Sequence, residues 1–317
     1  MEVNMRTARE VWQSVTRMWV VYVVHVVYPS LGVVGFIWGG AKAGANDPRV
    51  LASYIALCVY VLLLMATTAY IAAKFSRKAR YAQATSCIHA AIHRLRDANW
   101  YLERCISGEV SYEKAHLQKL LQPCLGSVAK AFTLVSSSTN RACIKVLGGK
   151  NEPPETAHVR TFCRDSESAA DNILQDEKEG DRHKVHKNTS YHEVLSGGKD
   201  FFFSNNLPKL GDLYLNTSKE LCPDGKLSYK ACIVLPIRYT RTEDEVGDSA
   251  SESKVLTLGF LAVDTNCVDA YDELYDIELG GIVADALFPV LWRSEIAKDI
   301  LHRNRAVAEI QPQVGSR

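Results

Sequence analysis

Two stretches decide the fold: YKACIVLPIRYT at residues 229–240 and VLTLGFLAVDT at residues 255–265. Both are rich in β-branched, aliphatic and aromatic residues, as is typical of buried strands. The segment between them, RTEDEVGDSASESK, is charged and contains one valine as its only large apolar residue. The sequence therefore predicts an antiparallel hairpin whose loop is exposed to solvent.

Two further strands are expected upstream of this hairpin. RACIKVL at 141–147 and HVRTFCR at 158–164 are β-branched or alternating in character, and glycines and prolines separate them. A helical stretch from about Tyr112 to Leu134 precedes these strands. A polar helical segment from about Ser166 to Gln175 follows them.

Two more helices are predicted around the hairpin. The pattern Ser190-x-x-Glu193 is a capping box that would open a short helix ending at Gly197. The last element, at 272–301, has acidic residues in its first turn, which suits the helix dipole. Pro289 is expected to kink or restart that helix.

This order of elements resembles the GAF-domain family. The residues that carry the resemblance are the YKACIVLPI strand ending at Pro236, the hairpin into LGFLAVDTN, Tyr271 four residues before Tyr275-Asp276, and the helix through Ile282, Ala284 and Leu287. The resemblance covers about residues 115–295. It implies an α+β fold, an antiparallel sheet flanked by helices, with a small-ligand pocket over the sheet and dimerisation through terminal helices.

The resemblance also implies which residues line that pocket. Carried onto this sequence, they are Arg160, Phe162, Arg164, Phe202, Ser204, Asn205 and Tyr229. Two arginines on one strand could hold an anion bidentately. The alternative is that these residues serve packing, turns or surface ion pairs.

Several family chemistries lack their residues here. The Cys-His pair for bilin attachment, the Asn-Lys-Phe signature of cyclic-nucleotide binders and the cysteine arrangement of free methionine sulfoxide reductases are missing. No cofactor and no metal are predicted, and the small ligand is unknown. His183, His186 and His192 are expected to be solvated, and the i, i+4 pair His89 and His93 has no evident third metal ligand.

Two charge-free stretches of 24 residues, at 18–41 and 50–73, precede the domain. About 20 helical residues span the ~30 Å hydrocarbon core of a bilayer. Trp19 and Trp38 occupy interfacial positions, His25 is the only titratable side chain of the first stretch, and Pro29 interrupts it. We expect two transmembrane helices within 18–73. The alternatives are a cleaved signal peptide for the first stretch, and buried helices of a soluble protein for both.

Basic residues at the ends of these stretches predict their orientation. Arg6, Arg9 and Arg17 precede the first stretch, and the run from Lys74 to Arg80 follows the second. The positive-inside rule then places both termini in the cytoplasm of a multi-pass inner or plasma membrane protein. The run beginning at Lys74 is attributed to this topology and to anionic lipid headgroups.

A heptad pattern follows within 74–110. Its large positions are Tyr81, Ile88, Leu95 and Leu102, and its small positions are Ala84, Ala91, Ala98 and Cys105. Such a seam indicates closely packed helices. Two interpretations are open: a parallel coiled-coil dimer, or a helix packed on its own domain.

The predicted organisation is a cytoplasmic N-terminus at 1–17, the two spans at 18–73, the amphipathic helix at 74–110, the GAF-like domain at 111–295 and a helix end and tail at 296–317.

Beyond residue 80 the chain has 28 basic and 33 acidic residues, which disfavours nucleic acid as a partner. No phosphate loop, nucleophile elbow, zinc-protease or kinase motif occurs, so an enzyme is not expected.

These observations predict a membrane-anchored GAF-like sensory or regulatory protein that binds a small ligand in the cytosol. No kinase or DNA-binding output follows the GAF-like region, so we expect signalling through a protein partner in trans or through its own oligomerisation. A homodimer or higher homo-oligomer in the lipid bilayer is expected. The alternative is a membrane-perturbing effector of a bacterial antiviral system, activated by a nucleotide-type ligand.

Overall fold

The computed structural model describes residues 30, 32, 34, 48–149, 152–168, 183–221, 227–240 and 255–310. The chain divides into two compact units, residues 1–78 and 79–317. The first predicted span, with Trp19, His25, Pro29 and Trp38, lies outside the described residues, apart from helical positions at Ser30, Gly32 and Val34. The two-helix hairpin therefore stays a prediction.

Apart from Ser30, Gly32 and Val34, the described part of the first unit belongs to helix α3 (Pro48–Ile106). Among the described residues, α3 alone is long and apolar enough, by length and composition, to cross a membrane. Its large exposed apolar side chains in this unit are Leu51, Tyr54, Ile55, Val59, Val61, Leu62, Leu63, Met65, Tyr70 and Phe75. Helical structure continues through the exposed Lys74, so the second predicted span and the juxtamembrane helix are parts of one element.

The second unit contains the rest of α3 and an α+β domain. The long elements after α3 are α4 (Lys114–Ser136), β1 (Asn140–Leu147), β2 (His158–Arg164), β5 (Ala231–Thr240), β6 (Val255–Thr265) and α9 (Glu273–Ile310). The short elements are β3 (His183–Lys184), η3 (Val185–Lys187), α6 (Thr189–Leu195), β4 (Phe202–Ser204), α7 (Leu207–Leu210), η4 (Gly211–Leu213) and α8 (Ser218–Leu221).

The strands form one antiparallel sheet in the order β3-β2-β1-β6-β5-β4. The predicted hairpin is confirmed as β5 and β6, which pair from Ala231 with Thr265 to Thr240 with Val255. The predicted antiparallel sheet flanked by helices is therefore present. The loop that joins the hairpin lies outside the described residues.

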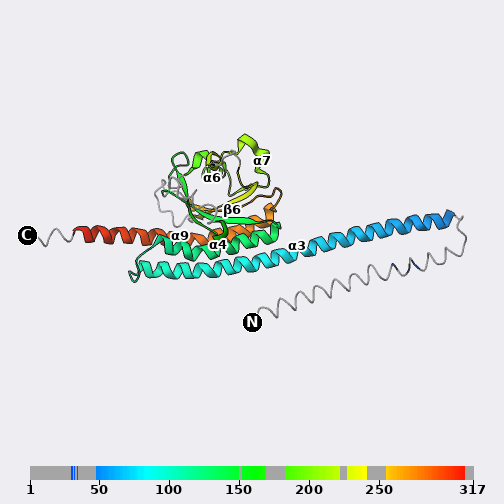
Figure 1. Cartoon of the computed structure of the whole chain (residues 1–317), viewed down its shortest axis with the longest axis horizontal. Coiled ribbons are helices and arrows are strands. Elements are labelled where there is room, and N and C mark those ends of the chain that lie inside the picture. The colour runs from blue at the N-terminus through cyan, green and yellow to red at the C-terminus, as the bar shows by residue number, and fades with distance from the viewer. Residues whose placement is uncertain are drawn as a thin grey trace, which may run out of the picture. The chain divides into compact units, whose positions relative to one another are not determined.

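Both faces of the sheet are covered, and each has its own hydrophobic core. Helices α4 and α9 lie along one face, and α6 and α7 lie on the other (Figure 1). The first core includes Phe132, Ile144 and Leu261. The second core includes Val159 and Phe260. Because β1, β5 and β6 supply residues to both cores, their strands are apolar over long runs.

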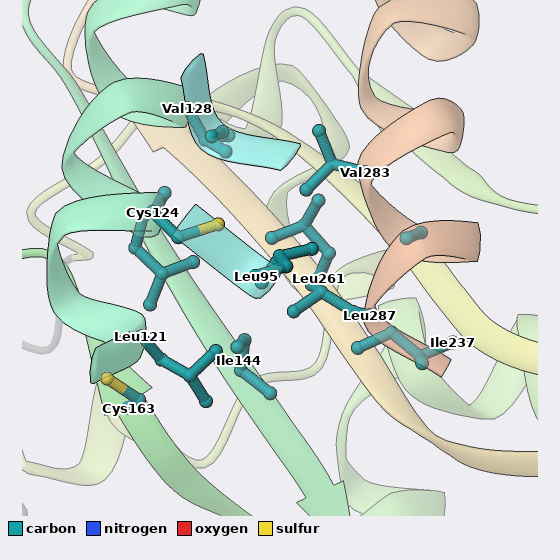
Figure 2. Packing of buried hydrophobic residues seen from close by; sticks show 14 of the residues in the cluster. Leu95, Leu121, Cys124, Val128, Ile144, Cys163, Ile237, Leu261, Val283 and Leu287 are labelled. Carbon is teal, nitrogen blue, oxygen red and sulfur yellow. The ribbon is translucent and has the colours of Figure 1, made fainter. Parts of the chain in front are cut away.

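The heptad seam of α3 packs against the chain's own domain. All its predicted positions except Tyr81 are buried in the first core, and Figure 2 shows Leu95 between Cys124 of α4 and Leu287 of α9. This corrects the coiled-coil interpretation of the seam, because the same side chains cannot also face a second copy. A dimer formed elsewhere remains a prediction.

Polar contacts fix α3 at both ends of this interface. Tyr81 Oη donates to Asp276 Oδ1 over 2.9 Å, and Arg94 Nη1 donates to Ser127 Oγ over 2.6 Å. Arg293 Nη1 of α9 donates to Asn99 Oδ1 over 2.6 Å. These bonds join α3 to both helices beneath the sheet.

The predicted cap of the short helix is wrong, and α9 does not restart at Pro289. The short helix α6 begins at Thr189 with Asn188 as its N-cap, so Ser190 is a buried first-turn residue and not the cap. Helix α9 is not restarted at Pro289 but continues to Ile310. Asp272 caps α9, since its Oδ1 accepts from the backbone N–H groups of Leu274 and Tyr275.

Replacing Gly259 by alanine is expected to destabilise the fold. A Cβ atom at this position in β6 would lie 2.1 Å from the backbone oxygen of Lys145 in β1. Backbone atoms cannot rotate away, so we expect a loss of about 1–3 kcal/mol or more in unfolding free energy. Thermal unfolding of the full chain in detergent, followed by circular dichroism, measures the change.

Gly281→Ala is the matched control, because a Cβ at Gly281 in α9 meets nothing within 4 Å. Alanine there favours the helix by about 1 kcal/mol. Equal melting temperatures for the two variants would contradict the close approach at Gly259.

Truncating Leu95 tests the position of the α3 seam. Leu95 is 3% exposed, whereas Ile92 on the same helix is 37% exposed. Leu95→Ala should cost about 2–5 kcal/mol through cavity formation, and Ile92→Ala much less. Because the seam is intramolecular, the melting temperature of Leu95→Ala should not depend on protein concentration. A melting temperature that rises with concentration would instead favour a dimeric seam.

Candidate functional site

A cavity of about 90 Å³ lies on the face of the sheet that carries the second core. Its floor comes from β1, β2, β5 and β6, and its walls come from the segments 183–191, 214–218 and 227–229. The floor residues are Arg141, Cys143, Lys145, Arg164, Cys232, Val234, Ala262, Val263 and Asp264.

Strand β1 supplies three polar or ionisable residues to this floor. Arg141, Cys143 and Lys145 alternate with Ala142 and Ile144, which belong to the core on the opposite face. Successive side chains of a strand point to opposite faces. The strand RACIKVL thus presents an apolar side to the helices and a cationic side to the cavity.

Strand β2 carries a bulge that redirects its side chains. Ile144 pairs with Cys163 but Lys145 pairs with Thr161, so Phe162 is an extra residue on β2. The alternation restarts at the bulge. Arg164 therefore faces the cavity beside Cys143. Arg160 pairs with Val146, which packs on the first core, so Arg160 lies on the opposite face of the sheet.

Cationic groups predominate on the cavity floor. Arg141 Nε donates to Asp264 Oδ1 over 2.7 Å, and Lys145 Nζ donates to Thr161 Oγ1 over 2.6 Å. Arg141, Lys145 and Arg164 supply three cations to the lining, and Asp264, which pairs with Arg141 across β1 and β6, is the one carboxylate among the described lining residues. Burial raises the pKa of Asp264, and the neighbouring Arg141 opposes that rise.

The walls are hydrogen-bonded around Asn188, Asn216 and Thr217. His183 Nδ1 lies 2.6 Å from Thr217 Oγ1, and Asn188 Oδ1 accepts from the backbone N–H of Thr217 over 3.1 Å. Asn216 Nδ2 donates to Tyr229 Oη over 2.7 Å. The wall segments are thereby joined to one another.

One thiol and three phenols of the cavity are held neutral by burial. Burial raises the pKa of the Cys232 thiol and of the phenols of Tyr191, Tyr214 and Tyr229. At neutral pH these side chains offer hydrogen-bond donors and acceptors but no negative charge. They therefore leave the cationic character of the floor intact.

The structure brings together only some of the residues that were predicted to bind the ligand. Arg164 and Tyr229 line the cavity. Phe202 and Ser204 are buried on the same side, where Phe202 packs on Tyr214 and Ser204 pairs with Cys232 across β4 and β5. Neither of them lines the cavity.

The remaining predicted residues lie elsewhere. Asn205 Nδ2 donates to the Tyr271 carbonyl over 2.7 Å, and Asn205 Oδ1 accepts from the Tyr271 N–H over 2.9 Å, so its amide serves as a clamp. Phe162 is buried in the helical core, and Arg160 is on the same face of the sheet. The structure therefore does not bring Arg160 and Arg164 together at one site.

The cavity contains residues that the sequence prediction missed. Arg141 and Lys145 occupy alternate positions of RACIKVL, so strict period-2 counting could have assigned them to one face. His183 is buried against Thr217, not solvated as expected, whereas His186 is exposed. Among the described residues no group of three His, Cys, Asp or Glu side chains could hold a metal ion.

Comparisons with known proteins give solved structures only. No protein-family model matches the chain, and no curated protein matches it. Similar structures include the GAF domain region of a putative membrane protein from Geobacter sulfurreducens PCA, at 16% identity and a TM-score of 0.35, covering 57% of this chain and 95% of that chain.

Two other similar structures come from a phosphotransferase and a reductase. The GAF domain from Acinetobacter phosphoenolpyruvate-protein phosphotransferase has 11% identity and a TM-score of 0.35, over 63% of this chain and 94% of that chain. A type II free methionine-R-sulfoxide reductase from Thermoplasma acidophilum has 13% identity and a TM-score of 0.34, over 56% and 94%. At these values, the function of this chain has to be inferred from its own cavity.

The raised thiol pKa values predict uneven cysteine reactivity. Burial raises the pKa of Cys163 to about 12 and that of Cys232 further still, so their thiolate fractions stay small as the pH rises from 7 to 9. Cys267 is exposed. Iodoacetamide should label Cys267 before Cys163 and Cys232, and labelling of Cys232 should change little over this pH range, as read by peptide mass spectrometry.

Cys267→Ser is the control, since it should remove the fast-reacting site without altering the buried ones. Labelling of Cys232 in the native protein as fast as that of Cys267 would contradict the closed, thiol-bearing floor.

Proposed function

We propose that this chain is a membrane-anchored sensory or regulatory protein whose GAF-like domain binds a small anionic ligand in the cavity over the sheet. One observation carries the proposal: Arg141, Lys145 and Arg164 all line the cavity, and Asp264 is the one carboxylate among the described lining residues.

The chemistry of the floor suits an oxyanion. Guanidinium groups present planar forks of N–H donors that match carboxylates and phosphates. Buried charges interact more strongly than exposed ones, because the surrounding dielectric is lower. The neutral hydroxyls of Tyr229 and Ser190 add polar contacts along the same cavity.

The size of the cavity favours a small ligand. Its volume of about 90 Å³ is well below the roughly 300–1,000 Å³ typical of pockets for drug-sized molecules. A carboxylate, phosphate or similar anion of few heavy atoms fits this volume better than a nucleotide. The nucleotide-activated effector therefore gains no support from the cavity.

The proposed output is regulatory. The apolar part of α3 supports anchoring in the membrane, and the basic residues from Lys74 onwards suit a cytoplasmic position for the domain. We propose that ligand binding is passed to a protein partner or changes the oligomeric state, with no covalent chemistry in the cavity. The protonated Cys232 thiol is consistent with that role, because the thiolate is the reactive form.

Two arginines of β2 provide a sharp test. Arg164→Gln removes a cation from the cavity, whereas Arg160→Gln removes one from the opposite face of the same strand. The full chain in detergent is titrated calorimetrically with phosphate, sulfate, acetate, malonate and adenosine monophosphate. We expect at least one small anion to bind, about tenfold or more weaker binding to Arg164→Gln, and unchanged binding to Arg160→Gln.

Equal weakening in both variants would mean that the anion responds to overall charge and not to the cavity. No binding of any of these anions to the wild-type chain would remove the support for an anion sensor.

A further inference from the structure

The exposed face of α3 carries two histidines with converging ring nitrogens. His89 Nε2 and His93 Nε2 lie 2.8 Å apart, and the two rings are edge-on with centroids 4.3 Å apart. Both residues are exposed. Neither takes part in the cavity over the sheet, so the function proposed above does not use them.

We propose that His89 and His93 form a bidentate site for a divalent transition-metal ion of the Ni²⁺, Cu²⁺ and Zn²⁺ class. Imidazole nitrogen is a preferred ligand for these ions. Residues four apart on a helix lie on one face, one turn apart. The spacing thus directs both rings to the same point in solvent.

The distance between the nitrogens fits chelation. With metal–nitrogen bonds of about 2.0–2.1 Å, two ligand nitrogens are about 2.9 Å apart at a 90° angle and about 3.3 Å apart at a tetrahedral angle. The observed 2.8 Å is nearer the first value. Both nitrogens can therefore be ligands of one metal ion after a small rotation of the exposed rings.

The backbone beneath the pair is held in place before any metal binds. Ile88, Ala91 and Leu95 of the same turns are buried in the helical core. Helix α3 therefore cannot rotate to bury the histidines, and the backbone loses little conformational entropy when a metal binds, so the cost is confined to ordering the two rings.

Two ligands leave the coordination shell open. No third His, Cys, Asp or Glu side chain joins this pair within the described part of the chain. Water or an added ligand would fill the remaining positions, which distinguishes this site from a closed structural metal centre. A bound ion would join successive turns of α3 and stabilise the helix by mass action.

Metal binding to variants of the tag-free full chain in detergent tests the site. Equilibrium dialysis with Ni²⁺ should give one ion bound per chain, and the nitrogen hyperfine pattern of bound Cu²⁺ should report two imidazoles. His89→Gln and His93→Gln should each weaken Ni²⁺ binding at least tenfold, because chelation is lost. His302→Gln, which changes a lone exposed histidine of α9, should leave binding unchanged.

A histidine pair moved one turn along α3 tests whether the i, i+4 spacing is sufficient for metal binding. Asp97 is exposed and lies four residues after His93, so the double variant His89→Gln with Asp97→His rebuilds an i, i+4 pair one turn further along. Binding should recover in that variant. The proposal is overturned if the wild-type chain binds no Ni²⁺, if His89→Gln and His93→Gln bind it as the wild type does, or if the rebuilt pair fails to bind.

Discussion

The fold depends on a sheet whose central strands are buried on both faces. Strands β1, β6 and β5 contribute to one core with α3, α4 and α9 and to a second core with α6 and its neighbouring segments. An uncovered face would leave large apolar side chains in water, at about 25 cal/mol for each Å². Both layers are thus required, and the cavity lies where polar side chains replace apolar packing on one of them.

The strands could be predicted because each apolar, β-branched run is bounded by residues that end a strand. Residues 255–265 form β6 as expected, and residues 158–164 form β2 as expected, since turn-forming residues or charged loops end these runs. The sequence left two interpretations open for the partner of the α3 seam. A stripe of large and small apolar residues has the same sequence pattern whether α4 and α9 or a second copy cover it, and only the tertiary structure distinguishes these cases.

The site was harder to predict than the fold because one extra residue changes which side chains share a face. Counting by twos placed Arg160, Phe162 and Arg164 together, but the bulge at Phe162 separates Arg164 from the other two. Nothing in HVRTFCR marks the bulge. His183 was difficult to predict for a different reason. Its neighbours in the sequence are polar, which favours an exposed position, but a hydrogen bond to Thr217, 34 residues away, holds it in the wall of the cavity.

The clamp at Asn205 links the edge of the sheet to the start of α9. Its amide exchanges two hydrogen bonds with the Tyr271 backbone, and one turn into α9 Asp276 accepts from Tyr81 of α3. Strand β4, next to the cavity strand β5, therefore cannot shift relative to α9 without losing both clamp bonds. Because the clamp joins the end of β4 to the residues just before α9, a displacement of this sheet edge would also have to move the start of α9.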